Sequence, residues 1–205
     1  MRLFAPARPR CAGCARVLGT PASHCGECLQ APSAFVRCIT VADYASPWRE
    51  LIAGFKFRQQ VELAGALADA LGRAVATADE RAPDWVLPVP LSRERLRERG
   101  FNQAWEIARR VARRRGWRAS AHLLQRVRDT AHQIGMTREE RARNLRDAFW
   151  VDDRFGRRLA GRRVALVDDV LTTGATAQAA ALALRRAGAD SVSLWVIART
   201  PLDPD

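Results

Sequence analysis

From about residue 36 onward, apolar and polar positions follow strand and helix patterns. Residues 36–44 are predicted to form a strand, and the short apolar run over residues 85–90, which ends in prolines, is typical of a buried strand that must stop and turn. Apolar residues at three- and four-residue spacing predict an amphipathic helix over residues 48–57. Further helices are expected over residues 62–78 and from residue 103 to about 115. Such a mixture is typical of an α/β domain.

The C-terminal part of the chain indicates one strand–helix–strand unit. Val164–Val167 is continuously apolar, which is typical of a strand buried on both faces of a parallel sheet. An alanine-rich helix then runs to Arg186, Gly188 ends it, and residues 191–198 form the next apolar strand. We therefore predict an α/β fold with a parallel sheet flanked by helices. The residues after Val167 lie at the carboxyl edge of that sheet, where open α/β sheets bind ligands.

Four of the five cysteines form the pattern CxxC-x10-CxxC, at Cys11, Cys14, Cys25 and Cys28. Each CxxC turn presents two thiolates, and two such turns supply the four soft ligands that structural zinc prefers. Gly13 and Gly26 are expected to ease the bends around the metal. Two disulfides or four free thiols are the alternatives, and His24 is an alternative ligand. Cys38 stands apart and is expected to be a small buried residue.

The N-terminal segment lacks a core pattern of its own. Its prolines are Pro6, Pro9, Pro21 and Pro32. So short a segment buries little apolar surface, and a metal is expected to supply its folding energy. The 205 residues are enough for one α/β domain and a small appendage. We predict a zinc-ribbon module over residues 1–35 and the α/β domain over residues 36–205.

Composition and charge add two expectations. No stretch approaches the roughly 18 apolar residues of a membrane span, and residues 1–11 lack the apolar core of a secretory signal. A cytoplasmic protein is therefore expected, and this setting favours zinc over disulfides. The net charge of +12 comes from 33 arginines and one lysine, Lys56, against 22 acidic residues. Such a surface attracts polyanions such as nucleic acid, while simple solvation of the arginines is the alternative explanation.

Two carboxylates, Asp168 and Asp169, follow the predicted strand. They precede a run of small and hydroxyl side chains, Thr172, Thr173, Gly174, Ala175 and Thr176. Backbone N–H groups at the helix start, together with threonine hydroxyls, predict a phosphate cradle that Gly174 allows to approach closely. The carboxylates are good acceptors for a vicinal diol. A ribose 5-phosphate satisfies both halves of this site.

Other nucleotide-site patterns do not fit the sequence. The chain contains no GxxxxGK[ST] and no GxGxxG after a strand, which excludes a P-loop triphosphatase and a dinucleotide-binding fold. A receiver domain would place its acidic pair after an early strand and would need another aspartate later. The remaining alternative is a buried strand that ends in solvated aspartates.

The run VALVDDVLTTGAT, residues 164–176, resembles the phosphoribosyl pyrophosphate signature of type I phosphoribosyltransferases. Nearly the whole chain resembles the ComF family, competence-associated phosphoribosyltransferase-like proteins with an N-terminal four-cysteine zinc module. Besides the cysteines, the likeness includes residues 50–57, Pro88–Leu91 and Arg99–Gln103. It continues through Arg126, Thr130, Gln133, Arg141, Asn144 and Phe149. Residues 36–205 would then form a phosphoribosyltransferase-like domain.

The resemblance implies a ligand and a role for several segments. Asp168 and Asp169 would bind the ribose hydroxyls of phosphoribosyl pyrophosphate, and residues 172–176 would hold its 5-phosphate. Mg²⁺ would bridge the pyrophosphate and the diol. Pro88–Leu91 would meet the pyrophosphate, and residues 126–141 would form a flexible cover. Three arginines are candidates for neutralising the leaving pyrophosphate: Arg97, Arg99 and Arg126.

No catalytic residue can be assigned, because no Ser-His-Asp order is recognisable, and His132 is interpreted as an exposed side chain. Two functions fit the sequence. One is transfer of a phosphoribosyl group to an acceptor. The other is a non-catalytic module that binds single-stranded DNA during natural transformation and retains the phosphoribosyl site. For the second, Arg109–Arg110 and Arg113–Arg115 are candidate phosphate contacts, and Trp105 and Trp117 are candidate stacking partners. Solvated arginines with tryptophans in the core are the alternative.

Overall fold

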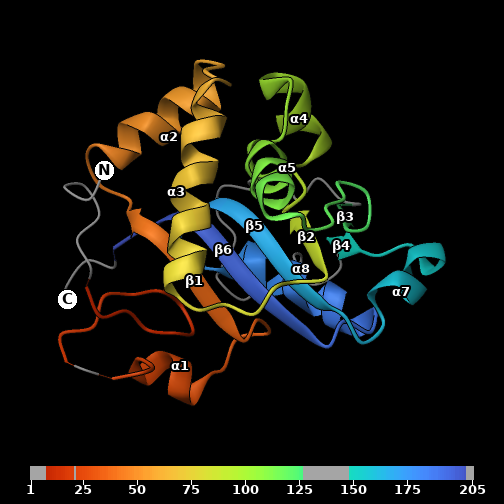
Figure 1. Ribbon diagram of the computed structural model, residues 1–205, viewed down its shortest axis with the longest axis horizontal. Coiled ribbons are helices and arrows are strands. Elements are labelled where there is room, and N and C mark those ends of the chain that lie inside the picture. Colours follow the sequence, from red (N-terminus) through yellow and green to blue (C-terminus); the bar gives the residue numbers. More distant parts are fainter. Residues whose placement is uncertain (1–7, 21, 127–147, 202–205) are drawn as a thin grey trace, which may run out of the picture.

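A computed structural model describes residues 8–20, 22–126 and 148–201 of the chain (Figure 1). A parallel sheet lies between helices, and residues 8–34, here called the four-cysteine segment, lie beside its edge strand. The predicted cover over residues 126–141 falls outside the described residues, except for Arg126. Among the helices that the structure describes, none is both long and apolar enough to cross a membrane.

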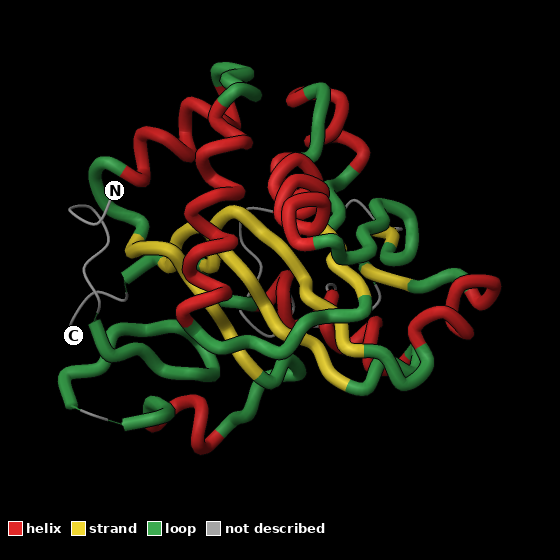
Figure 2. Tube along the Cα trace, in the orientation of Figure 1, coloured by secondary structure: helices red, strands yellow, loops and turns green. Residues whose placement is uncertain are grey.

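Four parallel strands form the main sheet, in the order β1-β6-β5-β2 (Figure 2). Their bounds are β1 Arg37–Asp43, β2 Trp85–Pro88, β5 Arg163–Leu171 and β6 Ser191–Arg199. Each coincides with a run that the hydrophobic pattern assigned to a strand, although β2 is shorter and β5 longer than predicted. The predicted fold class, a parallel sheet flanked by helices, is confirmed.

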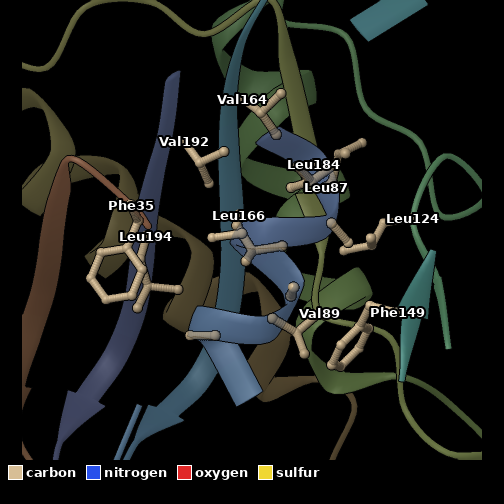
Figure 3. Packing of buried hydrophobic residues seen from close by; sticks show 14 of the residues in the cluster. Phe35, Leu87, Val89, Leu124, Phe149, Val164, Leu166, Leu184, Val192 and Leu194 are labelled. Carbon is tan, nitrogen blue, oxygen red and sulfur yellow. The ribbon is translucent and has the colours of Figure 1, made fainter. Parts of the chain in front are cut away.

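Successive residues of the central strand β5 face opposite sides of the sheet, as the pleat requires. Val164 and Leu166 belong to the core on the α8 side of the sheet (Figure 3). Ala165 and Val167 belong to the core on the other side. The strand is therefore buried on both faces, which explains why its sequence is continuously apolar rather than alternating.

Helices α2 (Trp48–Phe57), α3 (Leu63–Thr77) and α5 (Gln103–Arg115) pack on one face of the sheet, and α8 (Ala175–Arg186) packs on the other (Figure 1). All four match their predicted positions to within about a residue. Local caps explain why α5 has sharp ends. The Asn102 side chain accepts a hydrogen bond from the backbone N–H of Trp105, and Gly116 ends the helix in a left-handed conformation.

Several short elements were not predicted: α1 (Gly26–Gln30), α4 (Arg93–Arg99), α7 (Asp153–Leu159), and the antiparallel strands β3 (Gln125–Arg126) and β4 (Phe149–Trp150). None spans enough residues to show an apolar repeat. In α4, capping residues rather than an apolar repeat define where the helix begins and ends. Ser92 Oγ accepts from the backbone N–H of Arg95 at 3.2 Å, and Gly100 ends the helix with φ of 75°.

Candidate functional site

The acidic pair lies inside the last part of β5. The predicted strand over Val164–Val167 is too short, because pairing with β6 continues as far as Leu171. Pairing with β2, in contrast, ends where Pro88 meets Val167. Beyond Val167, the described part of the chain therefore pairs β5 on the β6 side only. Asp168 and Asp169 lie where β5 extends past its neighbour, at the carboxyl edge of the sheet.

The only lysine of the chain pairs with the second carboxylate. Lys56 Nζ lies 2.8 Å from Asp169 Oδ1, and the two side chains are 17% and 10% exposed. Helix α2 supplies Lys56 from its last turn, so this helix brings the ammonium to the carboxyl edge of the sheet. No sequence pattern assigned Lys56 a role in the site. The available signal was that a single lysine persists among 33 arginines.

The two carboxylates differ in environment. The backbone N–H of Asp169 donates to Asp168 Oδ1 at 2.8 Å, so the Asp168 side chain lies against the main chain of the next residue. Burial, with the negative charge of Asp169 as a further contribution, raises the pKa of Asp168 to about 7, although the charges of Lys56 and Arg95 act in the opposite direction. Arg95 thus belongs to the surroundings of the acidic pair, a placement that the sequence did not predict.

Replacing Asp168 should stabilise the protein more at high pH than at low pH. Well below pH 3.8, the Asp168 carboxyl is protonated in both the folded and the unfolded chain. As the pH rises from there to about 7, the unfolded chain releases this proton more readily, so the free energy of unfolding falls. Asp168→Asn removes that loss. Melting temperatures of the parent and the variant between pH 4 and pH 8 test this, and a difference independent of pH would contradict it.

Residues 172–176 join β5 to α8 and lead into the N-terminus of that helix. Gly174 has φ of 83°, a left-handed conformation that other residues adopt only with strain. A Cβ here would lie 3.6 Å from Leu171 Cδ1, an ordinary contact, so the backbone conformation rather than space requires glycine. Thr172 and Thr173 are exposed, and Thr173 Oγ1 accepts from the Ala175 N–H at 3.4 Å. This arrangement leaves a helix N-terminus able to bind an anion.

A second loop lies beside the acidic pair. The Val89 N–H donates to Val167 O at 2.8 Å, so Pro88–Leu91 stays next to β5 just before the aspartates. Asn102 Nδ2 donates to Val89 O at 3.1 Å, while its Oδ1 accepts the Trp105 N–H at 3.2 Å. One asparagine thus fixes both this loop and the start of α5. The structure brings two of the sequence blocks, Pro88–Leu91 and Arg99–Gln103, into direct contact.

The three predicted arginines lie in three different surroundings. Arg97 is exposed on α4. Arg99 donates to Gln103 Oε1 at 3.1 Å and lies over the Phe57 ring, with 5.2 Å from its Cζ to the ring centroid. Arg126 lies over the Phe149 ring at 5.5 Å. Arg99 is therefore placed to hold α2, α4 and α5 together around the site.

The four predicted cysteine ligands come together. The sulfur atoms of these four cysteines all lie within 4.8 Å of one another. Cys14 Sγ and Cys25 Sγ are 3.7 Å apart, close to the ~3.8 Å edge of a tetrahedron with Zn–S bonds of ~2.3 Å. All five cysteines are free thiols in the structure, with no disulfide between any two of them. His24 is not part of the cluster, and Cys38 is buried in β1 as expected.

Of the two glycines near these cysteines, only Gly13 relieves crowding at the sulfur cluster. Gly26 is the first residue of α1, and an added Cβ would meet nothing within 4 Å. At Gly13 an added Cβ would lie 3.0 Å from Cys28 Sγ, so glycine here leaves room for the thiol. Burial raises the pKa of the Cys11 thiol, but backbone N–H groups, that of Cys25 foremost, bring it down to about 7. Cys11 is therefore readily converted to the thiolate that binds metals.

The basic surface predicted on α5 is largely engaged within the protein. Arg109 and Arg110 pair with Glu106. Arg114 donates to Gly65 O at 3.0 Å, and Arg115 donates to Gly72 O at 2.7 Å, so both hold α3 against α5. The two flanking aromatic residues, Trp105 and Trp117, pack against the core. These contacts favour the structural explanation of this helix over base stacking.

The parallel α/β domain, its acidic strand end and its four-cysteine cluster define a phosphoribosyltransferase-like protein with an N-terminal metal-site pattern. No family model matches the chain. It is 38% identical over 190 residues to the DNA utilization protein YhgH of Escherichia coli strain K12, covering 89% of this chain and 82% of that protein. It is 33% identical over 195 residues to competence protein F of Haemophilus influenzae, covering 93% and 85%. The chain belongs to the ComF family of phosphoribosyltransferase-like proteins.

Solved structures with a similar fold are more distant. A glutamine phosphoribosylpyrophosphate amidotransferase from B. subtilis, complexed with ADP and GMP, is 22% identical with a TM-score of 0.43, covering 63% of this chain and 26% of that one. The protein TT1426 from Thermus thermophilus is 21% identical with a TM-score of 0.40, covering 69% and 85%. Both scores are low, so no function follows from these two structures.

Proposed function

We propose that the carboxyl edge of the sheet binds phosphoribosyl pyrophosphate with Mg²⁺, in a cytoplasmic protein linked to competence and DNA uptake. The observation that carries the proposal is the extension of β5 past β2, which puts Asp168 and Asp169 directly before a glycine-capped helix N-terminus. The names of the relatives, DNA utilization and competence proteins, support the link to DNA uptake. Phosphoribosyl transfer to an acceptor is the activity that such binding would serve.

Each part of the proposed ligand has a matching group in the protein. The 5-phosphate would accept hydrogen bonds from N–H groups of residues 172–176 and from the exposed hydroxyls of Thr172 and Thr173. The ribose hydroxyls would donate to the acidic pair. Lys56 keeps the Asp169 carboxylate in place through its 2.8 Å ion pair, so this acceptor is oriented before the ligand arrives.

The donor set also fits Mg²⁺, which prefers oxygen ligands and keeps several of its waters. Asp168 is the better candidate of the two aspartates to hold Mg²⁺, because Asp169 already forms an ion pair with Lys56. When bound, Mg²⁺ would neutralise charge on the pyrophosphate. For the four-cysteine cluster we propose zinc in a structural role, since four thiolates complete its tetrahedral coordination. Residues 1–35 would form the zinc module and 36–205 the phosphoribosyltransferase-like domain.

Phosphoribosyl pyrophosphate with Mg²⁺ should raise the melting temperature of the purified protein, because a ligand that binds only the folded chain stabilises it by mass action. At a concentration of about 100 times Kd the gain is roughly 2.7 kcal/mol. Ribose 5-phosphate should give a smaller shift, since it lacks the pyrophosphate. Differential scanning fluorimetry with and without Mg²⁺ measures both. No shift at millimolar ligand would contradict the proposal.

A second candidate function is binding of single-stranded DNA. For this function, one observation favours a different surface from α5. A hollow of about 520 Å³ lies between β4, α7 and the end of α8. Trp150 lines it with 40% of the residue exposed, and the exposed Arg186 lines it from α8. Arg157 and Arg158 in the last turn of α7 are also exposed. In proteins that bind single strands, an accessible aromatic ring stacks with a base while nearby arginines contact the phosphates.

Trp150→Ala with Arg186→Ala should weaken binding of an oligo(dT) strand about tenfold, given that stacking contributes about 1–3 kcal/mol per base. The salt dependence of the affinity should also become less steep, because a phosphate contact is lost. Arg113→Ala, an exposed arginine of α5, is the matched control and should change little. Fluorescence anisotropy over a range of salt concentrations measures this. An equal loss in the control would return the site to α5.

A further inference from the structure

Arg199 lies between the four-cysteine segment and the loop that follows β5. It ends β6, opposite Leu171 in the pairing of β5 with β6, and is only 6% exposed. Its Nε donates to Cys14 O at 3.0 Å. Its Nη1 donates to Leu171 O and Thr200 O, each at 3.0 Å, and to Thr172 O. All four acceptors are backbone carbonyls, so the buried guanidinium connects main chain to main chain.

These contacts determine where the following N–H groups point. A peptide unit is planar and trans, so the carbonyl of one residue and the N–H of the next point in opposite directions. The carbonyls of Leu171 and Thr172 point at Arg199. The N–H groups of Thr172 and Thr173 must therefore point away from it. Both belong to the loop that we propose holds the 5-phosphate. The Leu171 carbonyl also accepts the Thr200 N–H at 2.9 Å, so Arg199 and the pairing of β5 with β6 together orient the Thr172 N–H. Through Thr172 O, Arg199 orients the Thr173 N–H, a donor that it does not itself supply.

On its other side, Arg199 contacts Cys14, one of the four cysteines of the metal-site pattern. Cys14 supplies its carbonyl to Arg199 and its thiol to the cluster, where its Sγ lies 3.7 Å from Cys25 Sγ. A metal bound by that thiol would fix the backbone to which Arg199 donates. A second contact lies at the last residue of the same segment, where the Ala34 N–H donates to Gln178 Oε1 of α8 at 2.8 Å. The segment thus contacts α8, which follows the phosphate loop, and is linked to the loop itself through Arg199.

From these contacts we infer that Arg199 is a positioning residue through which metal occupancy of the four-cysteine cluster sets the phosphate affinity of residues 172–176. The inference rests on the proposed function of that loop. It depends on the shape of the guanidinium, whose separate nitrogens reach Cys14 on one side and the loop on the other. A lysine ammonium keeps the charge, but its single nitrogen cannot span both groups. Coupling of about tenfold is expected, within the about 5–150-fold range of coupled sites.

The test measures binding of phosphoribosyl pyrophosphate in zinc-loaded protein and in reduced protein from which zinc has been stripped and the chelator washed out. Isothermal titration with Mg²⁺ should show about tenfold weaker binding by the stripped parent. Arg199→Lys should bind weakly with or without zinc. Arg10→Gln is the matched control. Arg10 joins the same segment to β1 through Ala15 O at 3.0 Å and Asp43 Oδ1 at 2.8 Å, so this variant should keep the parent's zinc dependence.

Hydrogen exchange of the amides of residues 172–176, measured without ligand, separates this inference from the proposed function. Stripping zinc should speed exchange in the parent and leave Arg199→Lys unchanged. If the zinc-loaded parent does not bind phosphoribosyl pyrophosphate, the proposed function fails, while the exchange experiment still tests the connection. The inference would be overturned if the exchange rate in the parent did not change when zinc is stripped. It would also be overturned if stripping zinc changed the rate equally in Arg199→Lys. The parent measurement needs no variant, so it holds even if Arg199→Lys folds poorly.

Discussion

Cys28→Ser is expected to purify without zinc and to melt well below the parent protein, which should carry about one zinc per chain. The serine hydroxyl is a poor zinc ligand, and three thiolates leave the tetrahedral site incomplete. Apparent binding energies of structural zinc are on the order of 10 kcal/mol, and in a segment with little core this energy is folding energy. Elemental analysis and thermal unfolding measure the two effects. Freshly purified parent protein without zinc would refute the assignment.

His24→Ala is the control for this experiment. His24 lies beside Cys25 in sequence, but its Nδ1 lies 3.2 Å from Ser23 Oγ and it is not part of the sulfur cluster. The variant should therefore retain its zinc and melt close to the parent. A zinc content that falls in His24→Ala as much as in Cys28→Ser would mean that the histidine is a ligand.

Asp168→Asn combined with Asp169→Asn is expected to weaken binding of phosphoribosyl pyrophosphate with Mg²⁺ about hundredfold, while inorganic phosphate still binds. The amide keeps the shape of the side chain but offers one acceptor oxygen and no charge to the diol and the metal. Loss of one or two charge-assisted hydrogen bonds, at about 1.5–3 kcal/mol each, accounts for that factor. Isothermal titration of both ligands measures it. Unchanged affinity for phosphoribosyl pyrophosphate would make the aspartates a structural strand end.

The ion pair with Lys56 calls for a control in the same experiment. Asp169→Asn leaves a largely buried ammonium without its partner, and breaking a buried pair in this way costs about 3–5 kcal/mol. Lys56→Met with Asp169→Asn removes the pair as a whole and preserves the net charge. This variant should regain most of the lost stability and still bind phosphoribosyl pyrophosphate weakly. If binding recovers along with stability, the loss in the aspartate variants reflects unfolding rather than a missing diol contact.

Local sequence patterns predicted the main elements because local interactions determine them. The apolar spacing in α2 and the caps of α5 lie within the elements themselves, so their bounds follow from the residues. The end of β5 depends instead on β6, whose pairing carries the strand on to Leu171. The short strand β4 likewise depends on pairing with β3, whose residues lie well before it in the chain. A window of neighbouring residues contains no information on such pairings.

The same distinction applies to the site. Asp168, Asp169 and residues 172–176 could be predicted as ligand-binding residues because they follow an apolar strand within one short run of the sequence. Lys56 reaches Asp169 from a separate helix more than a hundred residues earlier, and Arg199 reaches Cys14 from the opposite end of the chain. Residue type alone marks neither as part of the site. Both emerge only when the fold brings distant segments to one edge of the sheet.

The solitary lysine makes the site observable by spectroscopy. In most proteins, isotope-labelled lysine gives many overlapping side-chain signals, but here all other basic side chains apart from histidine are arginines. Growth on ¹⁵N-lysine would label one ammonium in the whole chain, and that group lies 2.8 Å from Asp169. Its resonance would report directly on the carboxyl edge of the sheet during a titration. The arginine bias of this sequence therefore provides a built-in single-atom reporter without any mutation.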